Sequence, residues 1–187
     1  SMSRYSRMLL HFMHVLTTLR NDVHTFLFGT RLTNVTRFLR FKDVDEALAA
    51  TSSAVEDWSG GTRIGDCLKE FNFNWSRRVL GPGAIVLFIT DGLDRGGGIG
   101  LSKQIKLIQK SSKRLIWLNP LLRYEEFAPK PTGVKAILPH VDEFRPIHSL
   151  ESMDQLVNAL SETNLQSRFN MAPWLEKLSE IENAECH

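Results

Sequence analysis

The chain has 187 residues, and 42% of them are hydrophobic, which is enough to fill the core of one domain and an appendage. Its 23 Lys and Arg residues nearly balance its 21 Asp and Glu residues, so no overall charge field favours nucleic acid as a partner. Two cysteines cannot form a disulfide framework, and no apolar run approaches the roughly 20 residues that cross a bilayer. These properties indicate a cytoplasmic protein without a transmembrane segment, and they leave peripheral association with a membrane open.

Hydrophobic periodicity predicts helices that alternate with short strands. Apolar residues at helical spacing indicate helices that face a core, and short β-branched or aromatic runs bounded by Gly, Pro or Asp indicate strands. The strand at 84–90 has five consecutive apolar residues, so it is expected to be buried on both faces. In chain order, we expect a helix at 6–19, strands at 23–28 and 32–39, helices at 43–58 and 63–79, a strand at 84–90, a helix at 101–110, strands at 115–118 and 134–138, and a helix at 151–160.

Alternation of this kind predicts an α/β fold with a mainly parallel sheet that is covered by helices on both faces. The first two strands are separated by a tight turn, which is typical of an antiparallel edge. From residue 161 onward the sequence is polar with only a weak apolar pattern. We therefore expect one domain over residues 1–160 and a C-terminal extension, residues 161–187, that is marginal alone.

Three loops with oxygen-bearing side chains meet at one edge of the predicted sheet. They are residues 1–3, 59–62 and 90–92, and Asp91 comes directly after the strand at 84–90. Ligands of open α/β sheets bind at the carboxyl ends of the strands. Hydroxyl and carboxylate oxygens are the hard ligands that Mg²⁺ prefers. The sequence therefore makes Asp91 a candidate site residue and predicts a magnesium site at this edge.

The segments SMSRYSRM, SGGTRIGD and FITDGLDRG, followed by IWLNPLLRYEEFAPKPTGVKAILPHVDEFRPIHSLESM, resemble the CoxE-type branch of the von Willebrand factor A (VWA) domain family. The resemblance covers about residues 1–160 and implies a Rossmann-like fold. It also implies a metal-ion-dependent adhesion site (MIDAS), which is built from a DxSxS loop, a threonine in a second loop and an aspartate in a third. By that match the metal ligands are Ser1, Thr62 and Asp91, and the residues beside the metal are Ser3, Gly61, Gly92 and Asp94.

The same match implies that the chain begins inside the DxSxS motif. The aspartate of the motif, its first serine and the first, central strand of the sheet would then precede Ser1. A Ser-Met cloning scar could also supply Ser1, although the residues that follow continue the family pattern. We therefore expect Mg²⁺ or Mn²⁺ to bind in the full-length protein, and to bind weakly or not at all to this chain alone.

The resemblance implies a binding module rather than an enzyme. A bound Mg²⁺ would keep one position open, and an Asp or Glu from a partner would complete its shell. Proteins of this type belong to bacterial systems in which a VWA protein works with a MoxR-type AAA+ ATPase to mature or remodel a client. In the CoxE case these systems are associated with a molybdenum-containing carbon monoxide dehydrogenase, which is the expected type of client. The alternative is a phosphate-handling enzyme that uses Asp91 and the glycine-rich loop 96–100.

Each candidate residue also has a purely structural interpretation. Asp91-Gly92 after a strand fits a simple turn, and Thr62 fits the N-cap of the helix that follows it. Asp94 either supports the metal site or faces water from its loop. Three further residues lack the spacing of a metal cluster and are expected to be structural, namely His140, Asp142 and His148.

Overall fold

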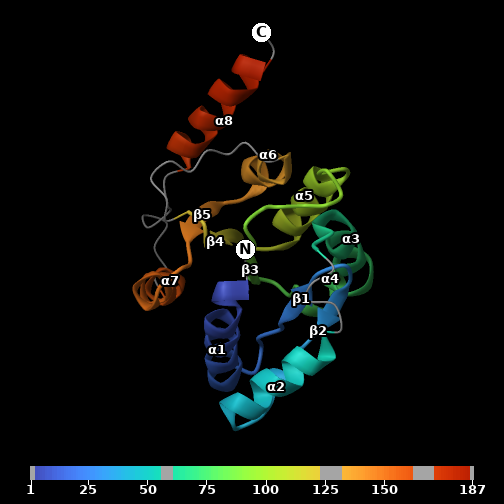
Figure 1. Ribbon diagram of the computed structural model, residues 1–187, viewed down its shortest axis with the longest axis vertical. Coiled ribbons are helices and arrows are strands. Elements are labelled where there is room, and N and C mark those ends of the chain that lie inside the picture. Colours follow the sequence, from blue (N-terminus) through green and yellow to red (C-terminus); the bar gives the residue numbers. More distant parts are fainter. Residues whose placement is uncertain (1–2, 56–60, 123–131, 162–170, 186–187) are drawn as a thin grey trace.

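The computed structural model describes residues 3–55, 61–122, 132–161 and 171–185. Its strands form a three-stranded parallel sheet and a separate antiparallel pair (Figure 1), so the predicted α/β class is confirmed. No helix in these ranges is long and apolar enough to cross a membrane. In chain order, the elements are α1 (Ser3–Leu19), β1 (Phe26–Phe28), β2 (Leu32–Asn34), the 3-10 helix η1 (Phe38–Arg40), α2 (Val44–Ala54), α3 (Ile64–Asn74), α4 (Ser76–Val79), β3 (Ile85–Ile89), α5 (Leu101–Ser111), β4 (Arg114–Asn119), α6 (Thr132–Ile137), the 3-10 helix η2 (Leu138–His140), β5 (Glu143–Pro146), α7 (Leu150–Ser161) and α8 (Ala172–Glu185).

The central strand of the parallel sheet is β4, which pairs with β3 on one side and with β5 on the other. Leu115 and Trp117 of β4 point to one face, Ile116 and Leu118 point to the other, and all four are fully buried. The sequence also predicted burial on both faces for β3, and this prediction is only partly right. Ile85 at the start of β3 is 39% exposed, because β3 pairs with β4 alone among the described strands.

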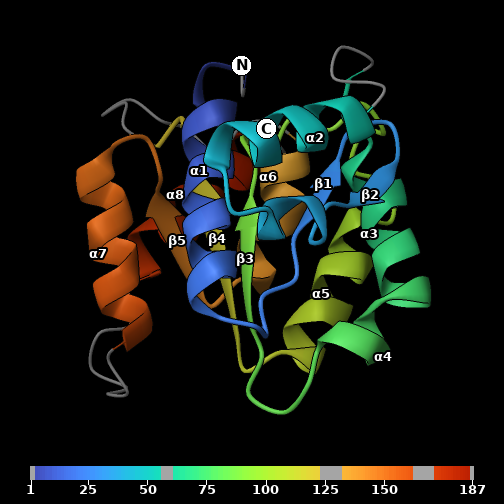
Figure 2. The ribbon, with the colours of Figure 1, turned by 90° about the horizontal axis from the view of Figure 1, so that it is seen from below.

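Helices cover both faces of the parallel sheet (Figures 1 and 2). On one face, α3, α5, α6 and α8 pack around Phe88, Trp117 and Phe144. On the other face, α1 and α7 pack against Ile116 and Leu118. Because the three strands are parallel, their carboxyl ends meet at a single edge, and the loops that follow them begin there.

The antiparallel pair β1-β2 lies beside β3, on the side away from β4 (Figures 1 and 2). Both strands are three residues long and therefore shorter than predicted, and the end of the second predicted strand forms η1 instead. The ring of Phe28 stacks on that of Phe88 with 5.7 Å between centroids, which ties the pair to the core. No described strand lies between β1 and β3. The additional central strand that the family resemblance implies stays a prediction.

The strand predicted at 134–138 is wrong, because these residues form most of α6 and the start of η2. Val134, Ile137 and Leu138 follow helical spacing, and all three are fully buried. A five-residue apolar run fits a buried strand and the buried side of a helix equally well, so periodicity alone could not decide. The last strand is β5, whose sequence EFRP carries two charges within four residues.

The helix predicted at 63–79 is interrupted at Trp75, where α3 ends and α4 begins. The indole of Trp75 packs edge-on against Phe26 of β1, with 5.2 Å between ring centroids. Tertiary packing therefore accompanies a break that helix propensity does not predict. By contrast, α2 begins where expected, because the Asp43 side chain accepts a hydrogen bond from Glu46 N at 2.8 Å and caps the helix.

The last helix, α8, lies within the predicted C-terminal extension and packs onto the core of the domain. The Trp174 ring contacts Phe144 edge-on, with 5.2 Å between centroids, and Leu178 is buried in the same cluster. The domain boundary at residue 160 stays a prediction. The extension nevertheless contributes a helix that covers Phe144 of the sheet.

Replacing Leu178 by alanine should lower the free energy of unfolding by about 2 kcal/mol, at the low end for a buried leucine because α8 lies at the periphery of the core. Leu175, one turn earlier on α8, is exposed and provides the matched control. Leu175→Ala should change stability by less than about 0.5 kcal/mol. Urea denaturation measures both variants, and equal losses would mean that α8 does not dock through Leu178.

Candidate metal site

Asp91 lies two residues after the end of β3, at the carboxyl end of the parallel sheet. Its side chain is only 6% exposed, and its Oδ1 accepts a hydrogen bond from Leu93 N at 3.0 Å. The preceding residue is tied to the core, because Trp117 Nε1 donates to Thr90 O at 2.9 Å. Thr90 Oγ1 in turn accepts from Gly92 N at 3.1 Å. These contacts turn the chain immediately after the strand and place a buried carboxylate at the predicted edge.

Gly92 is required by both backbone conformation and close packing. Its φ is +81°, and a Cβ would lie 2.7 Å from Val134 Cγ2 of α6. Gly133 makes an even closer approach from the other side, because a Cβ there would lie 2.2 Å from Gly92 O. The first turn of α6 therefore packs directly onto the turn that carries Asp91. The sequence singled out Gly92 but gave no signal for Gly133, since that contact depends on the fold.

Thr62 is half-buried in the loop that leads into α3. Its carbonyl oxygen accepts a hydrogen bond from Arg95 N at 2.9 Å. Gly61, with a φ of +83°, lies so close to the Arg95 side chain that a Cβ would be 2.2 Å from Nε. The capping alternative for Thr62 is wrong, because the N-cap position of α3 is Arg63, which makes no side-chain capping bond.

Asp94 links the Thr62 loop to the Asp91 loop. Its Oδ1 accepts a hydrogen bond from Ile64 N at 2.8 Å, and its Oδ2 accepts one from Gly98 N at 2.9 Å. The first bond satisfies an amide at the N-terminus of α3 that the helix itself cannot satisfy. Asp94 therefore binds backbone amides of two segments, and the alternative in which it simply faces water is wrong.

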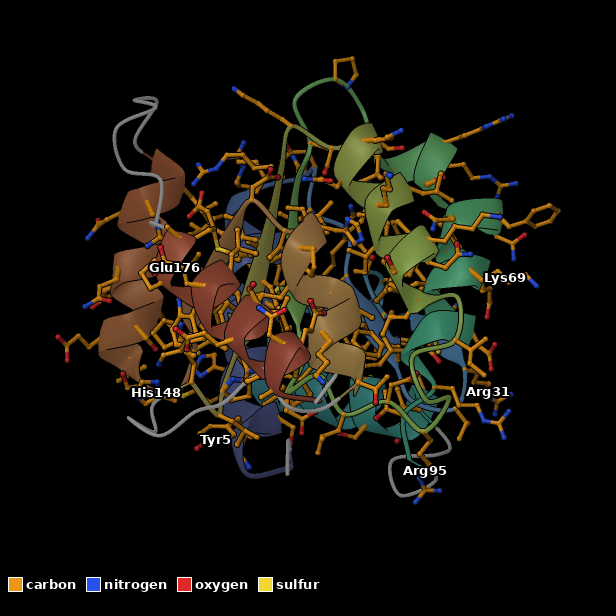
Figure 3. The ribbon with its side chains drawn as sticks, turned by 90° about the horizontal axis from the view of Figure 1, so that it is seen from above. Tyr5, Arg31, Lys69, Arg95, His148 and Glu176 are labelled. Atoms are coloured by element: carbon orange, nitrogen blue, oxygen red, sulfur yellow. The ribbon has the colours of Figure 1, made fainter. Side chains whose placement is uncertain are left out.

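The two remaining sequence candidates lie at the start of the chain. Ser1 is outside the described residues, and Ser3 is the first residue of α1. Figure 3 shows Tyr5, near the start of α1, and Arg95 toward the same end of the molecule. The structure thus brings the Thr62 and Asp91 loops together through Asp94 and Arg95, and the roles of Ser1 and Ser3 stay predictions.

Asn119, at the carboxyl end of β4, is a polar residue at this edge that sequence reasoning missed. Its side chain is fully buried, and its Oδ1 accepts a hydrogen bond from Leu121 N at 2.8 Å. Its Nδ2 has no hydrogen-bond partner among the described residues. An Asn-Pro pair after an apolar run signals only that a strand ends. Burial of the amide follows from the position of β4 in the middle of the sheet.

The glycine-rich loop 96–100 folds around Asp94. Besides the bond from Gly98 N to the carboxylate, Gly97 N donates to Asp94 O at 3.4 Å and Leu101 N donates to Gly98 O at 3.1 Å. A phosphate cradle needs free amides, whereas Gly98 N of this loop already donates to the Asp94 carboxylate, whose negative charge would repel a phosphate. The geometry therefore weighs against the phosphate-handling alternative.

The contacts of His140 and Asp142 support their structural interpretation. His140 Nε2 shares a hydrogen bond of 2.7 Å with Ser102 Oγ, and Asp142 Oδ2 accepts from Leu115 N at 2.7 Å. Burial, followed by the nearby charge of Lys106, lowers the pKa of His140. Within the described ranges, no group of three or more His, Cys, Asp or Glu side chains is placed to hold a metal ion.

The fold and the site define an α/β domain with a hydroxyl-bearing loop and a buried carboxylate at the carboxyl edge of a parallel sheet. The family model described as VWA domain containing CoxE-like protein matches residues 1–153, so the chain belongs to the CoxE-like VWA family. This confirms the resemblance drawn from the sequence. Domains of this family are typically non-catalytic interaction modules. A search among curated proteins gives no match.

Proposed function

We propose that this domain is a metal-dependent protein-binding module, in which Thr62 and Asp91 contribute oxygen ligands to Mg²⁺ or Mn²⁺. The observation that carries the proposal is the link between the two loops, through Arg95 N to Thr62 O and Ile64 N to Asp94 Oδ1. Ser1 would add a third oxygen. When bound, the ion supplies an open coordination position that an Asp or Glu of a partner fills.

The chemistry of the donors suits such an ion. A hydroxyl and a carboxylate are hard oxygen ligands, and Mg²⁺ prefers oxygen over nitrogen or sulfur. Asp91 is nearly buried, and a buried carboxylate is costly unless hydrogen bonds or a cation balance its charge. The bond from Leu93 N to Oδ1 orients the Asp91 side chain within its loop. Asp91 is therefore both electrostatically suited to a cation and restricted in conformation.

We further propose that the partner is a MoxR-type AAA+ ATPase and that the two proteins mature or remodel a client in the bacterial cytoplasm. The proposal rests on membership in the CoxE-like family, and a molybdenum-containing carbon monoxide dehydrogenase is the proposed type of client. The module would hold ATPase and client together through the metal. This role requires no bond-making step on the domain itself.

Removal of the metal should release the ATPase. Immobilised full-length protein should retain a purified MoxR-type ATPase in Mg²⁺ and lose most of it in EDTA, because the partner carboxylate would have no ion to bind. EDTA also removes Mg²⁺ from the nucleotide site of the ATPase, so Asp91→Ala tested in Mg²⁺ is the essential control. This variant should fail to retain the ATPase while leaving the ATPase intact. If the ATPase is retained both in EDTA and by Asp91→Ala, the interaction uses another surface.

A further inference from the structure

We infer that Asp94 is a positioning residue that couples the two loops of the candidate metal site. Metal affinity would then depend on a carboxylate that acts through backbone amides and need not touch the ion. The inference rests on the proposed metal site and adds to it the element that holds the ligands in place. It follows from the partners of the two Asp94 oxygens.

The first oxygen fixes the loop that carries Thr62. Oδ1 accepts a hydrogen bond from Ile64 N at 2.8 Å, and the Ile64 side chain is fully buried in the core. The Ile64 amide is thus held in place by α3 and by the core, and its hydrogen bond holds the Asp94 side chain beside it. Thr62 lies two residues before this anchor. The carbonyl oxygen of Thr62 accepts a hydrogen bond from Arg95 N at 2.9 Å. The adjacent residues Asp94 and Arg95 therefore each make one bond to the loop that carries Thr62.

The second oxygen fixes the loop that carries Asp91. Oδ2 accepts from Gly98 N at 2.9 Å, and Asp94 O accepts from Gly97 N at 3.4 Å. Gly96 lies between Asp94 and Gly97 in the chain, and a Cβ at Gly96 would be 3.1 Å from Asp94 Oδ2. The chain therefore wraps closely around the carboxylate. Asp91 is three residues upstream and is held by its own turn at Leu93.

Loss of the carboxylate should therefore loosen the contact between the loops before it unfolds the domain. The amides of Ile64 and Gly98 would lose their acceptor, and the bond from Arg95 N to Thr62 O would hold the two ligand-bearing segments less firmly than before. Ligands that must be ordered on binding give a weaker site than ligands that are already ordered. Residues that orient metal ligands typically contribute about 10–100-fold to metal affinity.

A negative charge near the ion could also raise affinity without positioning anything, and a conservative variant separates the two effects. Asp94→Asn removes the charge but keeps one oxygen that can accept from Ile64 N. Asp94→Ala removes both the charge and the acceptor. Positioning predicts an intermediate affinity for Asp94→Asn, whereas a pure charge effect predicts equal losses in the two variants.

The test is calorimetric titration of the full-length protein and its variants with Mn²⁺. Asp94→Ala should bind about 10–100-fold more weakly than wild type, with Asp94→Asn between them. Asp43→Ala is the matched control, because Asp43 caps α2 through Glu46 N at the same distance of 2.8 Å but joins no site loop. It should lower the melting temperature, as the loss of a helix cap does, yet leave Mn²⁺ affinity unchanged. Amide exchange at Ile64 and Gly98 should accelerate only in the Asp94 variants.

Wild-type affinity in Asp94→Ala, or equal losses in Asp94→Ala and Asp94→Asn, overturns the inference. Asp91→Ala, titrated in parallel, distinguishes that result from failure of the proposed function. If Asp91→Ala loses Mn²⁺ while Asp94→Ala keeps it, the metal site stands and Asp94 does not position it. If Asp91→Ala also keeps wild-type affinity, both the site and the inference fall.

Discussion

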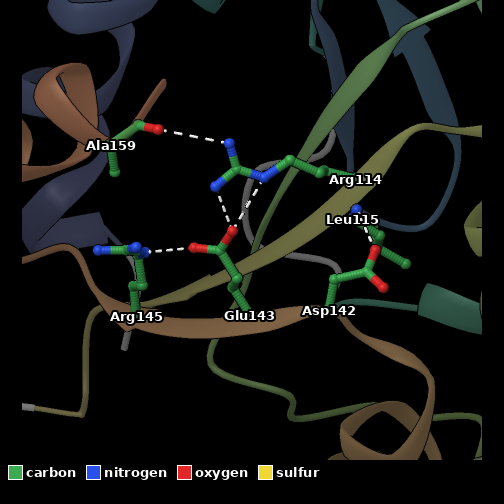
Figure 4. A network of polar contacts seen from close by, with 6 residues as sticks. All are labelled: Arg114, Leu115, Asp142, Glu143, Arg145 and Ala159. Carbon is green, nitrogen blue, oxygen red and sulfur yellow. Dashed lines mark hydrogen bonds and ion pairs between the residues drawn. The ribbon is translucent and has the colours of Figure 1, made fainter. Parts of the chain in front are cut away.

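Replacing Glu143 by alanine should lower the free energy of unfolding by about 3 kcal/mol. The Glu143 carboxylate is 1% exposed and lies between Arg114 and Arg145 (Figure 4). Arg114 Nε donates to Oε1 at 2.9 Å, and Arg145 Nε donates to Oε2 at 2.7 Å. Arg114 Nη1 also donates to Ala159 O at 3.3 Å, so the carboxylate holds this guanidinium against the last turns of α7.

The loss is large because the variant leaves two guanidinium groups close together without their shared counter-ion. Removing one partner of a buried ion pair typically costs about 3–5 kcal/mol. The lower end applies here, because the two arginine side chains are 18% and 14% exposed and keep some contact with water. Loosening of Arg114 should also weaken the contact between β4 and the C-terminal part of α7.

Urea denaturation followed by circular dichroism measures the effect, and the exposed pair Arg7–Asp45 provides the control. Asp45→Ala removes a 3.3 Å contact between two highly exposed side chains and should cost at most about 1 kcal/mol. If Glu143→Ala costs no more than Asp45→Ala does, the Glu143 network does not stabilise the sheet.

Asp91→Ala in the full-length protein should abolish the stabilisation that Mg²⁺ provides while leaving the fold intact. The apolar side chains of β3 make the packing contacts, whereas the Asp91 carboxylate lies in the loop beyond the strand. A ligand that binds only the folded state stabilises it by about 2.7 kcal/mol at 100 times its dissociation constant. We expect wild type to show a Mg²⁺-dependent rise in melting temperature and Asp91→Ala to show none.

Thermal melts of both proteins, each with and without Mg²⁺, make this comparison directly. In the absence of metal the two melting temperatures should be close, because the variant loses the loop hydrogen bond from Leu93 N but also removes a nearly buried charge. A variant that keeps the full Mg²⁺-dependent shift would show that Asp91 is not a ligand. The stretch after β3 would then be only a turn.

The parts of the fold that the sequence predicted well are those with a strong local signal. The long amphipathic helices α1 and α7 and the apolar strand β4 lie close to their expected positions. The strand β5 was missed because its four residues include two charges and no apolar run, whereas in the fold Glu143 accepts hydrogen bonds from both Arg114 and Arg145. The bond from Arg114 joins residues 29 positions apart, so no local pattern could reveal it.

The candidate site divides in the same way. Asp91 could be proposed from the sequence because it follows a recognisable apolar strand, and Thr62 because its loop matches the family motif. The linking role of Asp94 could not, since its bond to Ile64 N spans 30 positions and exists only when the two loops meet. The contact between Gly92 and Gly133 depends in the same way on where α6 packs.

Titration of the full-length protein with Mn²⁺, followed by displacement with Mg²⁺, measures whether this edge of the sheet is a metal site. We predict one ion per chain, displaced by Mg²⁺, and an affinity that falls about 10–100-fold in Thr62→Ala. The loss in Asp91→Ala should be greater, because a carboxylate stabilises a dication more than a neutral hydroxyl does. Absence of a bound ion, or wild-type affinity in both variants, would contradict a metal-dependent binding role for Thr62 and Asp91.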